Sequence, residues 1–260
     1  MNWTSYALDK LPIRNGFRMR GESMTRLEVF SDAAFAFAVT TLVVSVGSIP
    51  GNFDELILAL KKVPSFGLSF AQIAVFWIAH RSWSRRYGLE DKWTTGLTLS
   101  MVFTILVYVF PLRLIFSSFL AWATQGWIPG EFETKTVAEI QGLFVVYGIG
   151  FFVLTGILSG LFYRALKSAE ELGLNSFERI RTEEGVAMWL IQSGVGLVSA
   201  LWALLLPASW GVMAGFLYFV IPIAMPIVGV RYGRKAKRIL AALENPETRE
   251  KDETDELASS

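Results

Sequence analysis

The sequence predicts an all-α membrane protein with six transmembrane helices and with both termini in the cytoplasm. The first observation is composition: 53% of the 260 residues are hydrophobic and 18% are charged, with a mean hydropathy of +0.44. This apolar excess is larger than that of an ordinary soluble domain. The second is pattern, because short charged patches separate apolar stretches of about 20 residues, roughly the length of one helical span. The third is an asymmetry of basic residues between alternate loops.

The apolar stretches define the spans. A polar segment at 54–62 precedes the second span and predicts a short helix outside the membrane. An even number of spans puts both termini on the same side. The predicted spans cover residues 27–48, 64–80, 95–122, 137–163, 186–207 and 210–230.

Basic residues set the orientation of these spans. Four or five Lys and Arg residues lie before the first span and after the second, fourth and sixth, whereas each opposite loop holds two or fewer. Loops rich in Lys and Arg stay in the cytoplasm. We therefore expect cytoplasmic termini in a multi-pass protein of the cell (plasma) membrane. Arg113 is expected near the outer boundary of the third span, with its charged end reaching water.

The layout divides the chain into three segments. Residues 1–26 predict a basic cytoplasmic arm, and residues 27–230 predict one six-span membrane domain. Residues 231–260 are first basic and then acidic, and the acidic part has few apolar residues to bury. We therefore expect this cytoplasmic tail to be largely disordered. An amphipathic stretch at 169–184 predicts a solvated cytoplasmic helix.

The first span carries the most informative residues. Asp32 lies near its start, where a carboxylate must be buried among donors or lie close to the interface, since its charge is costly in hydrocarbon. On a helical wheel, Asp32 lies about 140° from Phe37 and so is turned away from that face. Asp32 is therefore predicted to brace the helix more readily than to bind an ion. The residues that share one face, within about 100° of one another, are Phe37, Thr40, Thr41 and Val44.

The start of this span carries the motif Arg26-x-x-x-Phe30-Ser31-Asp32, which is followed by small and apolar residues with Thr. This motif resembles the signature of the transmembrane protein 175 family of potassium channels. Prokaryotic members of the family are short chains, and we expect this chain to be one of them.

A second element supports the same resemblance. Trp77-x-x-His80 lies at the cytoplasmic end of the second span. Many relatives continue with a second histidine, whereas this chain has Arg81. The Trp-x-x-His element alone would be a weak signal, so the resemblance depends on the two motifs together.

The resemblance implies a homotetramer in which four first helices line one central pore. It also implies a hydrophobic constriction instead of a Gly-rich carbonyl filter, and this sequence has no Thr-Val-Gly-Tyr-Gly string. Such a pore would conduct potassium with modest selectivity. The chain departs from the family at Phe37, where relatives usually carry Ile or Leu, and at Thr41, where an apolar residue is common. Carried onto this chain, the pore-lining positions are Phe37, Thr40, Thr41 and Val44.

Each of these features also has a purely structural alternative. The Phe37 face could be a packing face between helices, because the small residues that follow the motif favour close helix contact. The Arg, Ser and Asp of the motif could be a polar cluster that only fixes packing. His80 could be an interfacial histidine, a brace for the motif or a proton sensor.

The main alternative functions are a secondary transporter and an accessory membrane subunit. A transporter is expected to show repeated halves, broken helices and intramembrane charges, and the sequence shows few such charges and no pairing of halves. An enzyme is not expected, because one His, no Cys and no apposed carboxylate pair leave no catalytic constellation. We expect no cofactor, and no metal beyond transient potassium in the pore. The expected partners are further copies of the chain and membrane lipid, since a net charge of +1 gives no bias toward nucleic acid.

Overall fold

The structure, a computed structural model, describes residues 3–21, 23–44, 49–132 and 136–244. Within these ranges, six helices are long and apolar enough to cross a membrane, which confirms the predicted six-span helical architecture. The elements are α1 (Ser5–Asp9), β1 (Ile13–Arg14), β2 (Phe17–Arg18), α2 (Arg26–Val44), α3 (Phe53–Lys61), α4 (Val63–Tyr87), α5 (Lys92–Ala123), α6 (Val137–Lys167), α7 (Ser176–Leu205), α8 (Ala208–Gly211), the 3-10 helix η1 (Val212–Phe219) and α9 (Val220–Glu244).

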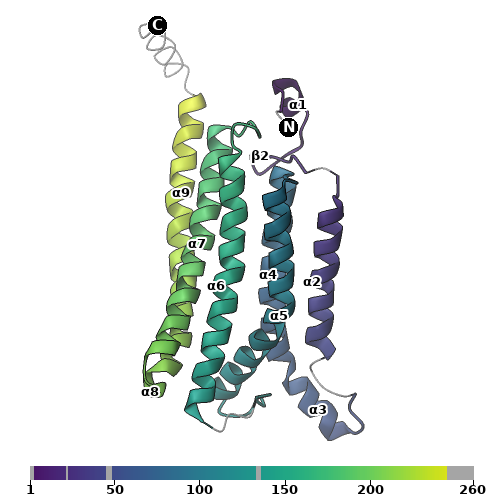
Figure 1. The fold of residues 1–260 in the computed structure, drawn as a ribbon, viewed down its shortest axis with the longest axis vertical. Coiled ribbons are helices and arrows are strands. Elements are labelled where there is room, and N and C mark those ends of the chain that lie inside the picture. The colour runs from purple at the N-terminus through teal and green to yellow at the C-terminus, as the bar shows by residue number, and fades with distance from the viewer. Residues whose placement is uncertain (1–2, 22, 45–48, 133–135, 245–260) are drawn as a thin grey trace.

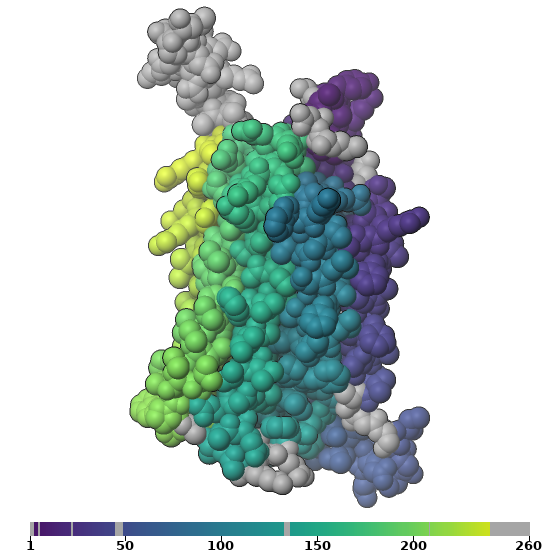
Figure 2. Space-filling view, viewed as in Figure 1, coloured from purple at the N-terminus to yellow at the C-terminus, as the bar shows by residue number. Residues whose placement is uncertain are grey.

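The long helices lie side by side along one axis (Figure 1). α6 packs along α7 and also on α5, and α7 packs on α9. α2 lies at one edge of the bundle, where it packs on α4 and α5. α1 and the end of α9 lie at the same end of the bundle, whereas α3 and α8 lie at the other end. The space-filling view shows an elongated body from which α3 projects (Figure 2).

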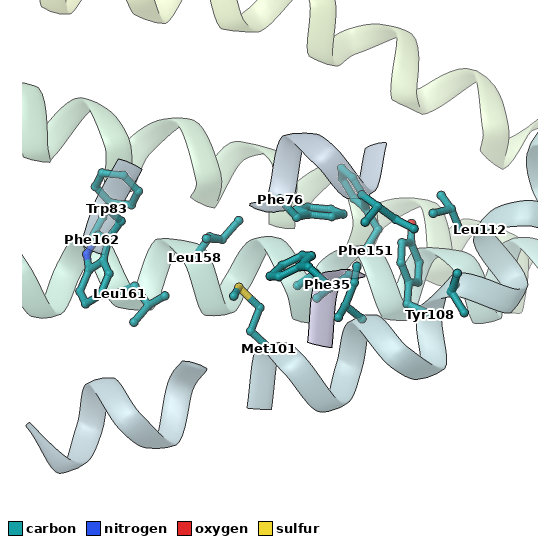
Figure 3. Close-up of a cluster of buried hydrophobic side chains, with 14 of the residues drawn as sticks. Phe35, Phe76, Trp83, Met101, Tyr108, Leu112, Phe151, Leu158, Leu161 and Phe162 are labelled. Carbon is teal, nitrogen blue, oxygen red and sulfur yellow. The ribbon is translucent and has the colours of Figure 1, made fainter. Parts of the chain in front are cut away.

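Large apolar side chains from α4, α5 and α6 fill the centre of the bundle (Figure 3). The Phe76 ring lies 6.5 Å from the Tyr108 ring and 6.2 Å from the Phe151 ring, measured between centroids. Phe35 of α2 belongs to the same cluster. Lipid tails are as apolar as these side chains, so inside a membrane close packing rather than exclusion of water holds the helices together. The cluster thus joins α2 to the rest of the subunit.

Two glycines allow α6 and α7 to approach each other closely. A Cβ built on Gly148 would lie 3.0 Å from the carbonyl oxygen of Gly196. A Cβ built on Gly196 would lie 2.8 Å from the backbone nitrogen of Phe152. Small residues at such contacts let membrane helices pack backbone to backbone. α6 and α7 therefore form a tightly packed pair in the body of the subunit.

The fifth span begins earlier in the chain than predicted. α7 starts at Ser176, where Asn175 and Glu178 form a capping box. The prediction of a separate solvated helix at 169–184 is wrong, because residues 168–173 form a turn and Glu178 is fully buried. The Glu178 carboxylate is paired with Arg20 inside the protein instead of being hydrated.

The last helix extends beyond the predicted sixth span. α9 continues through the basic stretch 231–238 to Glu244, so this part of the tail, which we expected to be largely disordered, is helical. The acidic remainder of the tail, residues 245–260, lies outside the described residues, as does the end of the first predicted span, residues 45–48.

The segment expected to be a basic cytoplasmic arm is folded against the bundle. β1 and β2 pair as a hairpin, and its turn residues Asn15 and Gly16 have φ angles of 52° and 77°. Such positive angles favour Asn and Gly in a two-residue hairpin turn. Phe17, which follows the turn, is buried with its ring centroid 5.5 Å from that of Tyr87 at the end of α4. The hairpin therefore packs on the bundle through its aromatic residue.

A buried ion pair fastens this segment to α7. The Arg20 guanidinium donates to Glu178 Oε2 at 2.8 Å and to the carbonyl of Leu172 at 2.8 Å. Both charged side chains are fully shielded from solvent. One residue later, the Gly21 N–H donates to the carbonyl of Arg85 at 3.1 Å. Because α2 begins shortly after Gly21, this anchor sets where the first span enters the bundle.

We expect Glu178→Gln to destabilise the protein by about 3–5 kcal/mol, because Arg20 would be left buried without its charge partner. The double variant Arg20→Met/Glu178→Met should recover most of this loss, since no uncompensated charge remains. Arg14→Gln, at an exposed position of the same segment, should change little. Thermal unfolding in detergent measures all of them. Equal losses for Arg14→Gln and Glu178→Gln would contradict a specific role for the ion pair.

Candidate functional site

A capping box starts α2. The Thr25 N–H donates to Glu28 Oε2 at 3.0 Å, and the Glu28 N–H donates to Thr25 Oγ1 at 3.2 Å. This pairing satisfies two backbone donors at the start of the helix. The Thr-x-x-Glu string that signals the cap is present in the sequence and is not among the predicted site residues. The cap fixes the point at which the helix begins.

One face of α2 packs on the subunit itself, against α4 and α5. Its residues are spaced alternately by three and four positions, as neighbours on one side of a helix must be. The Ser31 hydroxyl on this face donates to the carbonyl of Glu28 at 2.9 Å, so it is satisfied within the helix. The buried residues are Glu28, Ser31, Phe35, Ala38 and Leu42.

The opposite face of α2 is open. Phe37 and Val44 are 64% and 71% exposed. Thr40 is exposed and Thr41 is partly exposed on the same side. The helical wheel predicts that these residues share a face. The structure places all of them on the side of α2 opposite to the one that packs on α4 and α5. α2 lies at the edge of the bundle, as Figure 1 shows.

The two threonines of this face keep oxygen lone pairs available. The Thr40 hydroxyl donates to the carbonyl of Ala36 at 2.9 Å, and the Thr41 hydroxyl donates to the carbonyl of Phe37 at 3.0 Å. A hydroxyl that donates its proton to its own helix can still accept a hydrogen bond or coordinate a cation through its oxygen. Both oxygens therefore place negative partial charge on the open face.

Asp32 is tied to α4. The Trp77 indole N–H donates to Asp32 Oδ1 at 2.8 Å, which joins the two motifs across 45 residues of sequence. The Asp32 side chain is partly buried by this contact. Of the other motif residues, Arg26 and Phe30 are exposed and Ser31 is buried.

A small pocket with charges of both signs opens beside Asp32. Two carboxylates and two guanidinium groups line it, so neither sign dominates. The Arg81 guanidinium also lies over the Trp77 ring, 5.2 Å from its centroid, in a cation–π contact that helps to hold the indole in place. The lining residues are Met24, Glu28, Asp32, His80, Arg81 and Arg85.

His80 lies inside the contact between α4 and α5. It is 3% exposed, and its Nε2 lies 3.2 Å from Thr98 Oγ1. Its ring stacks beside that of Trp83, with the centroids 6.2 Å apart. This burial does not fit a solvated interfacial histidine. The structure thus places His80 in a packed contact between two helices.

The charged end of Arg113 does not reach water, contrary to the expectation from the sequence. Arg113 is 4% exposed and forms an ion pair with Glu131. Its guanidinium also donates to the carbonyl of Leu42 in α2 at 2.7 Å. The sequence signal that could have indicated this arrangement is Glu131, a carboxylate in the loop that follows α5.

Three comparisons relate this arrangement to known proteins. Residues 26–111 match the family model described as endosomal/lysosomal potassium channel TMEM175. A protein of Marivirga tractuosa described as a potassium channel is 35% identical over 236 residues, which cover 86% of this chain and 94% of that protein. The crystal structure of a variant of the potassium channel MtTMEM175, in complex with a nanobody–MBP fusion protein, matches with a TM-score of 0.72 and 33% identity, over 85% of this chain and 99% of that one. The chain therefore belongs to the TMEM175 family, a family of ion channels and not of enzymes.

Proposed function

We propose that this chain is the subunit of a potassium-selective cation channel in which the Phe37 face of α2 lines the pore. The observation that carries the proposal is the two-faced character of α2. One face packs on α4 and α5, and the opposite face, with Phe37 and Val44, is exposed. The relatives described as potassium channels support potassium as the permeant ion.

A pore of this kind needs several copies of the chain. One α2 helix at the edge of its bundle provides only one wall (Figure 1). Further copies must bring their exposed α2 faces together around a common axis. We propose a homotetramer, as the family resemblance implies. The ends of the described chain lie together at one end of the bundle, which supports the proposal that both termini are in the cytoplasm and that the channel lies in the plasma membrane.

Phe37 is proposed to form the narrowest part of the pore. A ring of apolar side chains around an axis expels water and holds ions back until the side chains turn aside or the helices move apart. With α2 starting at the cytoplasmic side, Thr41 and Val44 lie further out than Phe37. The hydroxyls of the threonines therefore follow the apolar constriction directly.

Modest selectivity follows from partial dehydration at this constriction. Potassium holds its water less strongly than sodium does, so stripping part of the hydration shell penalises sodium more. The oxygen of Thr41, whose proton is engaged by the carbonyl of Phe37, can replace part of the lost coordination. A few hydroxyls offer fewer ligands than stacked rings of backbone carbonyls, and the resulting discrimination is correspondingly weaker.

Asp32 is proposed to brace α2 and not to bind the permeant ion. Its carboxylate accepts a hydrogen bond from Trp77 of α4, on the flank of α2 away from Phe37. A charge-assisted hydrogen bond of this kind is stronger than one between neutral groups and fixes geometry. Asp32 and Trp77 would thus hold the first turns of α2 against α4.

Purified protein should be tetrameric and should conduct ions without any partner. Native mass spectrometry in detergent is expected to show tetramers, and liposomes containing only this chain should pass potassium faster than sodium under matched gradients. A stable monomer that conducts would contradict the pore along α2. Tetramers without any flux would favour an accessory subunit instead of a channel.

Variants of the open face should change conduction without preventing assembly. Phe37→Ala is expected to raise basal flux and to weaken discrimination between potassium and sodium, because ions could pass with more of their water. Thr41→Val keeps nearly the same volume without the hydroxyl and should alter selectivity or conductance. Both are measured as liposome flux, with size-exclusion chromatography to confirm tetramers.

Matched controls for these variants lie on α5. Phe103 is an exposed phenylalanine, and the Thr104 hydroxyl donates to the carbonyl four residues earlier, as that of Thr41 does. Phe103→Ala and Thr104→Val should leave flux and selectivity as in the wild type. If Phe37→Ala and Thr41→Val behave like these controls, the pore lies elsewhere.

Trp77→Phe removes the donor to Asp32 and should lower the thermal stability of the tetramer by about 1 kcal/mol, because the partly buried carboxylate loses a hydrogen bond. The ratio of potassium to sodium flux should stay unchanged. Trp93→Phe, at an exposed tryptophan, serves as the control and should affect neither quantity. A Trp77→Phe tetramer of normal stability with altered ion preference would instead make Asp32 a ligand of the permeant ion.

A further inference from the structure

Like Arg20, Arg113 is buried. It belongs to α5 and lies beside Leu42 of α2, and a buried charge is unusual in a transmembrane helix. Arg113 lies within α5 and is 4% exposed. A charged side chain in such a helix is costly unless it faces the protein interior and finds partners there. The partners of Arg113 therefore indicate why a charge is kept at this position.

Glu131 holds the Arg113 guanidinium in one orientation. Nε of Arg113 donates to Oε2 of Glu131, and Nη2 of Arg113 donates to Oε1 of Glu131, so the pair is bidentate. The side chains are 5% and 10% exposed. Glu131 is itself fixed, because its backbone N–H donates to the Ser117 hydroxyl at 2.7 Å, and Ser117 is fully buried. A planar guanidinium paired through two parallel hydrogen bonds has little freedom to rotate.

The remaining side of the guanidinium reaches α2. Nη1 of Arg113 donates to the carbonyl oxygen of Leu42 at 2.7 Å. Leu42 lies two residues before Val44, the last residue of α2 that the structure describes. Arg113 and Glu131 therefore hold α2 through a backbone carbonyl, and we call this pair the cap.

The capped carbonyl is adjacent to the open face. Leu42 follows Thr41 directly, and its own side chain is 1% exposed on the packed side of the helix. The Asp32–Trp77 contact holds α2 ten residues earlier, about 15 Å away along the axis. We propose that Arg113, held by Glu131, is a positioning residue for conduction that fixes the height and rotation of Thr41 and Val44 at the outer end of the pore. This inference depends on the proposed function, because it assigns a role relative to the pore face.

The first test compares ion discrimination among variants of the cap. Arg113→Lys keeps the positive charge but removes the planar guanidinium. Glu131→Gln removes the negative charge that holds the guanidinium. Both should reduce the ratio of potassium to sodium flux in liposomes severalfold while tetramers persist. Arg164→Gln is the control, because it breaks the ion pair between α6 and Asp91, which precedes α5, and should leave the flux ratio unchanged.

The second test reports the position of α2 without using flux. The chain has no cysteine, so Val44→Cys introduces a single thiol at the outer end of the open face. Its rate of modification by a water-soluble thiol reagent added outside should change severalfold when Arg113→Lys is added, and should not change when Arg164→Gln is added.

These measurements separate the cap from the channel proposal. Unchanged flux ratios in Arg113→Lys and Glu131→Gln, together with an unchanged modification rate at position 44, would overturn the cap as a positioning device. A wild-type protein that conducts no ions would overturn the proposed function. The modification rate would even then show whether Arg113 holds the end of α2.

Discussion

The packing of α2 against α4 and α5 is the interaction on which the rest of the structure depends. Phe35 and Leu42 are buried on one side of the helix, which fixes its rotation in the subunit. Inside a membrane this fixation comes from close contact, since transfer between lipid and protein gives apolar groups little driving force. The same rotation decides which side chains remain exposed on the opposite face, among them Phe37 and Val44. The packing of α2 in the core therefore also determines which residues form its open face.

Charged groups then fix α2 along its own axis. Arg20 lies before its start and pairs with Glu178, and Arg113 lies at its end and pairs with Glu131. Each guanidinium also donates to a backbone carbonyl. Buried ion pairs are poor evidence for stability, because removing two charges from water costs as much as their attraction returns. Their directional geometry makes them better suited to setting register than to adding stability.

The features that the sequence predicts correctly depend on local patterns. Spans follow from hydropathy, and the shared face of α2 follows from helical periodicity, so neither requires knowledge of distant contacts. The sequence predicts that Asp32 braces the helix, but it does not indicate that Trp77 supplies the donor to Asp32. The pairing of Arg20 with Glu178 joins residues 158 positions apart, and one sequence does not indicate which carboxylate meets which cation. The burial of the Arg113 guanidinium was missed for the same reason, because its partner Glu131 lies in a loop of irregular structure.

The distance in sequence between Arg20 and Glu178 imposes an order on biosynthesis. The N-terminal segment cannot dock until the start of α7 has been translated, and contacts that close long loops form later than local ones. The spans from α2 to α6 thus enter the bilayer while residues 3–21 still lack the part of their binding site that α7 supplies, the Glu178 carboxylate. The helix that is translated first reaches its final register last. A chain that ends before α7 consequently lacks one of the two ion pairs that anchor α2.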